Sequence, residues 1–334
     1  MKRANKLKLY FSLLLISVPV LFCWNLLSGS ADISIINAVA DLFSGNESTD
    51  ALIFFEIRLP RAMLAVCIGI SLALSGAALQ GLLINPLASP DLLGVSQSGV
   101  FAAVVVLYYG LASVSWLVVP LAAMSGALIA VAIIFSLAGR YQGALTIILI
   151  GIAINAMTTA MTSLALNFAP NPFALQEIYF WMLGSLSNRS SNELFFAFPF
   201  MLLGWMMILS RRHFLDAMSL GEDTAKSLGF NLLTQKWLLI SGVAFCTGAS
   251  VAVSGNISFI GLMVPHLLRP LVNHEPGRLL AYSAVGGAAL LLLADSLVQN
   301  IPGTQELQVG VITAALGGPF FLFLKFLLST YNIN

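Results

Sequence analysis

The apolar residues of this chain fall into long blocks, and each block is close to the roughly 20 residues that a helix needs to cross a bilayer. Hydropathy read over that length gives ten candidate spans. They lie near 9–28, 62–84, 95–111, 116–138, 144–166, 194–210, 237–254, 256–271, 279–298 and 307–328. The divisions within 95–138 and 237–271 rest on few interruptions, so eight or nine crossings are an alternative count.

The charge content agrees with a membrane protein. Only 9% of the 334 residues are charged and 59% are hydrophobic, whereas soluble domains carry about 25% charged residues. The sequence therefore predicts an all-α polytopic protein with a single transmembrane domain over residues 1–334. A net charge of +1 excludes an extended basic surface for nucleic acid. The first apolar run, 9–27, exceeds the length usual for a signal peptide, so we expect a retained helix.

The cations are distributed unevenly between the two sides. With a cytoplasmic N-terminus and ten crossings, every Lys and Arg falls on the cytoplasmic side except Arg58, Arg61 and Arg189. Cytoplasmic loops of membrane proteins carry such an excess of Lys and Arg. The sequence therefore predicts that both termini are cytoplasmic.

Several kinds of chemistry are missing from the sequence. It contains no GxxxxGK[ST] loop, so the chain itself should not hydrolyse ATP, and no HExxH or GxSxG motif, so an intramembrane enzyme is disfavoured. His213, His266 and His274 are too dispersed to predict a metal site. Asp295 is the one ionisable residue well inside a predicted span; a packing role suits it at least as well as ion coupling. An ion-coupled secondary transporter and a membrane scaffold are the alternatives from other classes.

Two arginines stand at the outer start of the second predicted span, in Arg58-Leu59-Pro60-Arg61. Pro60 is suited to open a helix, because the first amides of a helix have no intrahelical partner. Spacing of three places both guanidinium groups on one face, where they could pair with carboxylates of an external protein. Snorkelling of both side chains to the interface is an equally good explanation.

The longest inner loop, about 210–236, contains a candidate helix. Glu222 stands where a short helix would begin and Gly229 where it would end. Such a helix is expected to expose Leu220, Ala225 and Leu228. These side chains could fill a groove on a cytoplasmic partner, although an ordinary amphipathic loop helix would have the same pattern.

Two other segments carry helix-breaking residues. Asn85-Pro86 and Ser89-Pro90 should end the second span and stiffen the connection that follows. In the segment 258–266, Gly261 and Pro265 interrupt a short apolar run, as in the broken helices of transporters.

Five motifs together resemble one family. RLPR, NPLASPDLLGV, LGEDTAKSLG, ISFIGLMVPHLLR and GVITAALGGPFFLFLK occur in order along nearly the whole chain. They are similar to the permeases of ABC importers for iron-siderophore complexes, haem and vitamin B12. The resemblance implies a type II ABC importer permease fold of about ten transmembrane helices in lipid of the bacterial inner membrane.

The same resemblance implies a set of partners. The permease would form a homo- or heterodimer with a second permease subunit. Two cytoplasmic ATPase subunits would bind ATP and Mg, so this chain would need no cofactor of its own. A periplasmic substrate-binding protein would deliver the cargo.

The resemblance also assigns roles to particular residues. Arg58 and Arg61 match external arginines that receive glutamates of the binding protein. The ATPase-coupling region corresponds to Leu220, Gly221, Glu222, Ala225, Leu228 and Gly229. An inner gate would fall at Gln142, Gly143, Ala144 and Thr146, although Gly143 and Ala144 replace more polar residues of other members. Gln299 stands where some members have a third docking arginine, which suits a heterodimer.

Ferric siderophores are the expected cargo within the family. NPLASPDLLGV and the segment 180–186 look most like siderophore members. Vitamin B12 and haem are the alternative cargoes.

Overall fold

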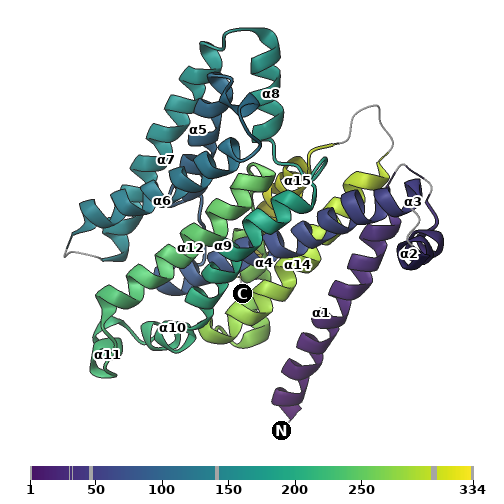
Figure 1. Cartoon of the computed structure of the whole chain (residues 1–334). Coiled ribbons are helices and arrows are strands. Elements are labelled where there is room, and N and C mark those ends of the chain that lie inside the picture. The colour runs from purple at the N-terminus through teal and green to yellow at the C-terminus, as the bar shows by residue number, and fades with distance from the viewer. Residues whose placement is uncertain are drawn as a thin grey trace.

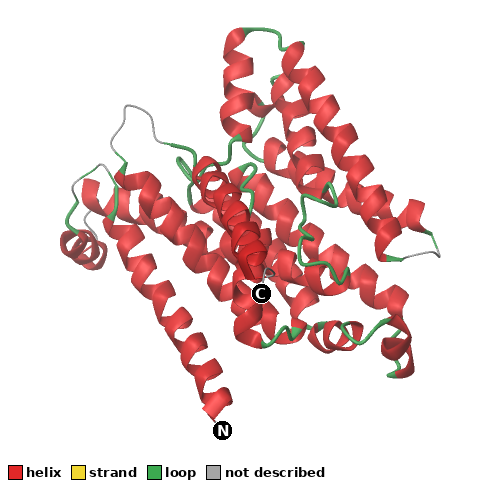
Figure 2. Ribbon diagram, turned by 180° about the vertical axis from the view of Figure 1, so that it is seen from behind, coloured by secondary structure: helices red, strands yellow, loops and turns green. Residues whose placement is uncertain are grey.

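The computed structural model describes residues 2–29, 31, 33–44, 48–139, 143–301 and 307–331, and this part of the chain contains helices and no strand (Figures 1 and 2). The long or apolar helices are α1 (Lys2–Leu27), α4 (Leu59–Leu82), α5 (Val95–Tyr108), α6 (Val118–Ala138), α7 (Ala144–Asn167), α9 (Ser191–Leu209), α12 (Leu232–Ser254), α13 (Ile260–Leu268), α14 (Pro276–Asn300) and α15 (Val309–Tyr331). Each of the ten predicted spans falls on one of them. The all-α membrane fold is therefore confirmed.

Not all ten helices are long enough to cross a bilayer by themselves. Within the described residues, seven candidate spans reach that length and hydropathy, one of them Thr49–Leu82. The apolar helices over 95–108 and 260–272 are shorter, whereas α15 has 23 residues. Such short segments persist at membrane depth only where neighbouring protein satisfies their ends.

Helices α4 and α12 form the centre of the bundle. Figure 1 shows α6 and α7 at one edge and α1 at the opposite edge, with α4, α9, α12 and α14 between them. A Cβ at Gly69 would overlap the carbonyl of Gly287 on α14, and one at Gly76 would overlap the carbonyl of Gly261 on α13. These glycines allow the close backbone approach that holds membrane helices together without a hydrophobic drive.

The start of the second span differs from the prediction. The helix does not open at Pro60, because α3 (Thr49–Leu52), a π-helical segment η1 (Ile53–Arg58) and α4 run on without a break. The N–H of Leu59 bonds to the carbonyl of Phe54, five residues earlier. This wider turn can accommodate the missing amide hydrogen of Pro60 inside a continuous helix.

Besides α3 and η1, four short helical elements lie outside the predicted spans and two more overlap the end of one. They are α2 (Ile35–Ser44), η2 (Leu111–Ser113), α8 (Pro172–Met182), α10 (Arg212–Met218), α11 (Glu222–Ser227) and η3 (Arg269–Val272). Only α11 was anticipated, because the others are too short to register at a window of about 20 residues.

The predicted interruption after the second span is present, whereas Gly261 and Pro265 do not interrupt their segment, because both lie inside α13 and the break falls before it. Helix α4 ends at Leu82, before Asn85-Pro86, and α5 begins after Gly94, which has φ +69°. Residues 255–259 separate α12 from α13, and Phe259 takes φ +68°, a left-handed conformation that is strained for a non-glycine residue. The Ser185 N–H donates to the Ser254 carbonyl at 2.7 Å and so supplies a hydrogen bond to one of the backbone groups at this break.

Candidate functional site

Arg61 lies in a buried polar cluster at the end of the bundle where α1 ends. Its Nη2 lies 2.8 Å from Oδ1 of Asp295, and its Nε lies 3.0 Å from Oδ2. Asn25 and Gln299 donate to the same Oδ2 at 2.9 and 2.8 Å. Asp295 has no exposed surface and the Arg61 side chain is 11% exposed. The cluster ties α1, α4 and α14 together and gives Asp295 a packing role.

Arg58 lies against different groups. Its guanidinium donates from Nη1 to the Leu26 carbonyl at 2.9 Å and from Nη2 to the Ala31 carbonyl. These carbonyls belong to the end of α1 and the residues after it, so a buried Arg58 satisfies acceptors that the helix leaves open. The side chains of both arginines are largely buried in the isolated chain. Docking through Arg58 and Arg61 therefore stays a prediction.

The inner loop has the predicted short helix. Glu222 opens α11, and Gly229, with φ +88°, follows its end. The Phe230 N–H bonds to the Ala225 carbonyl at 3.2 Å, closing the helix in a Schellman-like turn. We call residues 212–229, which contain α10 and α11, the coupling segment.

One face of α11 differs from the prediction. Leu220 and Leu228 are 68% and 62% exposed and could enter a groove on a partner. Ala225, however, has no exposed surface, and its predicted exposure is wrong. A helix of six residues is not stable alone, so one face must pack on the bundle to hold it. Ala225 belongs to that packed face.

Two polar contacts connect the coupling segment to long helices. Lys236 on α12 is nearly buried and its Nζ lies 2.7 Å from Glu222 Oε1. Asp216 on α10 accepts the Gly277 N–H at 2.7 Å and so caps the start of α14. Movement of the coupling segment would therefore act directly on α12 and α14. Residue spacing alone could not reveal either pair.

The predicted gate lies where α7 begins. Gly143 is the N-cap residue of α7 and is exposed, while Ala144 and Thr146 are half-buried in its first turn. Gln142 lies outside the described residues. The gate assignment stays a prediction.

A polar face of α7 was not singled out from the sequence. Asn155, Thr159, Ser163 and Asn167 follow one another at four-residue intervals on this otherwise apolar helix. Ser163 and Asn167 bond to carbonyls of the preceding turn at 2.9 and 3.0 Å, as lipid-facing polar residues can. The side chains of Asn155 and Thr159 have no hydrogen-bond partner among the described residues. Inside a membrane, such groups need water or another protein.

Asn155 also lines a polar pocket of about 290 Å³. The pocket lies where α7 meets the connection before α5 and the break between α12 and α13. The amides of Gln97, Asn155 and Asn256 all line it, and none has a side-chain hydrogen-bond partner within the described residues. Burial raises the pKa of Asp91 at its wall, while a hydrogen bond with Ser96 opposes that rise. The pocket thus presents polar groups without protein partners.

The sequence comparisons identify the family. The model of the FecCD transport family matches residues 14–326. This chain belongs to the FecCD transport family. Among curated relatives of this FecCD chain, a hemin transport system permease of Yersinia pestis is 37% identical and the alignment covers 89% of this chain and 90% of the relative. An Fe(3+)-citrate import system permease of Bacillus subtilis is 35% identical, and the alignment covers 90% of this chain and 89% of the relative.

Further relatives extend the range of cargoes. A vitamin B12 import system permease of Yersinia pseudotuberculosis is 37% identical over 82% of this FecCD chain and 81% of the relative. A solved chain, described as a metal-chelate type ABC transporter in an inward-facing conformation, superposes with a TM-score of 0.83 at 29% identity, covering 95% and 98% of the two chains.

Family membership fixes the general role of the chain. It is a multi-pass permease subunit of an ABC importer and not an enzyme; ATP hydrolysis belongs to a separate subunit. Permeases of this kind dimerise and work with an ATPase and a substrate-binding protein.

Proposed function

We propose that this FecCD permease carries ferric chelates across the bacterial inner membrane, with ferric siderophores as the preferred cargo. The observation that carries the proposal is the polar face of α7, where Asn155 and Thr159 lack protein partners inside an apolar span. A siderophore already surrounds its iron with ligand atoms. The path therefore needs neutral hydrogen-bonding groups and no metal ligands.

The path would form between two permease subunits, identical or related. In the isolated chain, α7 is the least buried of the spans after α1, with 17% of its apolar window buried. A second subunit facing α7 would cover this surface and enclose its polar residues. The Gln97, Asn155 and Asn256 amides would then border the inner part of the path. The gate at Gln142, Gly143, Ala144 and Thr146 would close its cytoplasmic end.

ATP binding by two cytoplasmic ATPase subunits would drive the change of access. Leu220 and Leu228 would seat in the ATPase, with Gly221 providing the turn between α10 and α11. The contacts Glu222–Lys236 and Asp216–Gly277 would pass the movement to α12 and α14. This arrangement places both termini in the cytoplasm.

The binding protein would dock at the outer end, near Arg58 and Arg61. Docking of its carboxylates requires that at least one guanidinium turns outward from its present partners. Gln299, which by the resemblance stands where some members have a third docking arginine, donates to Asp295. A single chain would therefore offer fewer docking cations, which favours a partner permease with a different outer surface.

Haem is the second candidate cargo, because the Yersinia pestis hemin permease matches most of this chain. Uptake of radioactive iron from a panel of siderophores, ferric citrate and haem, and of radioactive cobalt from vitamin B12, measured in a strain lacking the gene, separates the candidates. We expect loss of uptake for at least one siderophore, restored by the intact gene. Loss of haem or vitamin B12 uptake with normal siderophore uptake would contradict the proposed cargo.

A further inference from the structure

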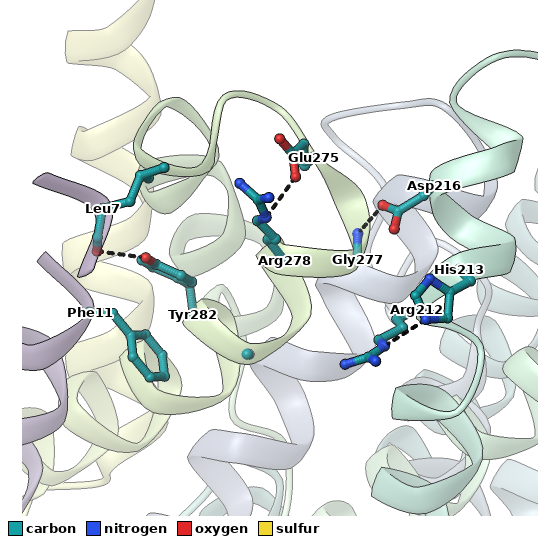
Figure 3. A pocket seen from close by; sticks show the side chains of 10 residues that line it. Leu7, Phe11, Arg212, His213, Asp216, Glu275, Gly277, Arg278 and Tyr282 are labelled. Atoms are coloured by element: carbon teal, nitrogen blue, oxygen red, sulfur yellow. Dashed lines mark hydrogen bonds and ion pairs between the residues drawn. The ribbon is translucent and has the colours of Figure 1, made fainter. Parts of the chain in front are cut away.

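A second pocket, of about 640 Å³, lies at the end of the bundle that carries the N-terminus (Figure 3). Its walls come from the start of α1, from α10 and from the first turns of α14. We call it the wedge pocket. It is lined by none of the residues assigned above to the path, the gate or the outer cluster, although Arg212, His213 and Asp216 belong to the coupling segment.

The polar end of the wedge pocket has a cation without a carboxylate partner. Both acidic residues of the pocket are already engaged: Asp216 accepts the Gly277 N–H, and Glu275 lies 2.8 Å from Arg278 Nε. Arg212 donates Nε to His213 Nε2 at 3.1 Å and is not ion-paired with any carboxylate in the described residues. In Figure 3, Arg212 extends from α10 toward α14. Its terminal nitrogens remain available to an anion.

The other end of the wedge pocket is apolar and aromatic. The Tyr282 hydroxyl donates to the Leu7 carbonyl at 2.8 Å, and the rings of Phe11 and Tyr282 lie 4.8 Å apart. Arg278 and Tyr282 are one turn apart on α14, a rise of about 6 Å. Over this distance the lining changes from charged to aromatic, as the surroundings of a protein do between lipid headgroups and acyl chains.

Lipid has lateral access to this pocket. Only 6% of the apolar window of α1 is buried within the chain, so α1 stands largely against the bilayer. The sequence has Lys2, Arg3, Lys6 and Lys8 in the first turns of the same helix. Basic pockets between membrane helices at the cytoplasmic side bind anionic headgroups.

We propose that the wedge pocket binds an anionic phospholipid of the cytoplasmic leaflet. Its phosphate lies between Arg212 and Arg278, and an acyl chain follows Phe11 and Tyr282. The Arg212 guanidinium, which has no carboxylate partner among the described residues, and the position of the aromatic end match such a lipid. A bound lipid would brace α10 against α1 and α14 and thereby hold the coupling segment in place. The inference depends on the cytoplasmic placement of the N-terminus, and not on which chelate is transported.

Photoactivatable lipids test this site in the full-length permease, purified with the subunits that accompany it. Phosphatidylglycerol and phosphatidylcholine carrying the same diazirine on the acyl chain are incorporated into vesicles, and the labelled peptides are identified by mass spectrometry. We expect phosphatidylglycerol to label peptides of α1, α10 and the start of α14 at least about fivefold more than phosphatidylcholine. Arg212→Gln should remove most of that preference.

Lys226→Gln is the matched control, because Lys226 is an exposed cation of α11 that does not line the pocket; its lipid preference should be unchanged. A melting curve of each variant checks folding, and Arg278→Gln provides a second variant of the site. Equal labelling by the two lipids overturns the proposal, as does an unchanged preference in both arginine variants. If the permease purified without the ATPase is labelled and the label is absent from the complete complex, the pocket is a protein interface and the proposal is overturned. Displacement by millimolar inorganic phosphate assigns it to a soluble anion.

Discussion

Replacing Arg61 by Glu should destabilise the permease strongly. The change removes the only cation bonded to Asp295 among the described residues and places a second carboxylate beside a group that has no exposed surface. Breaking a buried ion pair costs about 3–5 kcal/mol, because the remaining charge loses its partner in a low-dielectric site. Asn25 and Gln299 would still donate to Asp295, but amides cannot neutralise it.

Inactivation at a fixed temperature gives the measurement, since membrane proteins of this size commonly unfold irreversibly. If most of the cost appears in the unfolding rate, the half-life of the detergent-solubilised complex should fall at least about tenfold. The exchanged pair, Arg61→Asp with Asp295→Arg, should recover most of that loss. A half-life within about twofold of the original for Arg61→Glu would show that the ion pair contributes little and would refute this reasoning.

The exchanged pair also separates packing from docking. Its stability is restored, yet the cation now stands on α14 instead of α4. If Arg61 docks the binding protein, then the affinity of the exchanged variant, measured at low salt where such contacts are least screened, should stay weakened. Full docking by this variant, and by one with Arg58→Gln, would reduce both arginines to structural roles.

Four other substitutions have defined outcomes. Gly221→Trp should uncouple ATP hydrolysis from uptake in vesicles while the protein still inserts. Gly221 has φ +102°, a conformation that costs a residue with a side chain about 1–3 kcal/mol. Normal coupling in this variant would contradict the role of this turn. Leu228→Asp should weaken co-purification of the ATPase, because Leu228 is exposed. Ala225→Leu should instead lower the melting temperature, because overpacking a buried position reduces the free energy of unfolding by about 1–3 kcal/mol. The reverse pattern would contradict the assigned faces of α11. Gly76→Leu should abolish folded protein in size-exclusion profiles, because its Cβ meets the Gly261 carbonyl.

The fold could be predicted largely from hydropathy, because each spanning helix must supply its own backbone hydrogen bonds and so appears as a long apolar block. Helix α2, with ten residues, and α8, with eleven, gave no such block. Pro60 was misleading because a π-helical turn, which depends on the local backbone, carries the helix through it. The α12–α13 break had a signal in Gly255 and Asn256, whereas Pro265 lies inside α13 and does not mark it.

The sequence predicted some of the candidate functional residues and not others. The short helix at Glu222 followed from its charges and Gly229, but the burial of Ala225 depends on how that helix lies on the bundle. The partner of Arg61 is 234 residues away, which spacing cannot reveal. The polar face of α7 did have a signal, the four-residue spacing of Asn155 and Thr159 with later polar residues. What gave it significance was their lack of partners in the structure.

The central claim is that this polar face of α7 lines the transport path. Thiol accessibility along α7 tests it most directly, in a background where the exposed Cys23 is replaced by alanine and the buried Cys67 and Cys246 are retained. Thr159→Cys samples the polar face, and Met157→Cys, at an exposed position lining an apolar groove, is the control.

In the assembled complex, a charged, water-soluble thiol reagent should modify Thr159→Cys, and the cargo should protect it. Met157→Cys should react only with a lipid-soluble reagent. If Met157→Cys reacts with the charged reagent and Thr159→Cys does not, the polar face of α7 does not line the path and the account is contradicted.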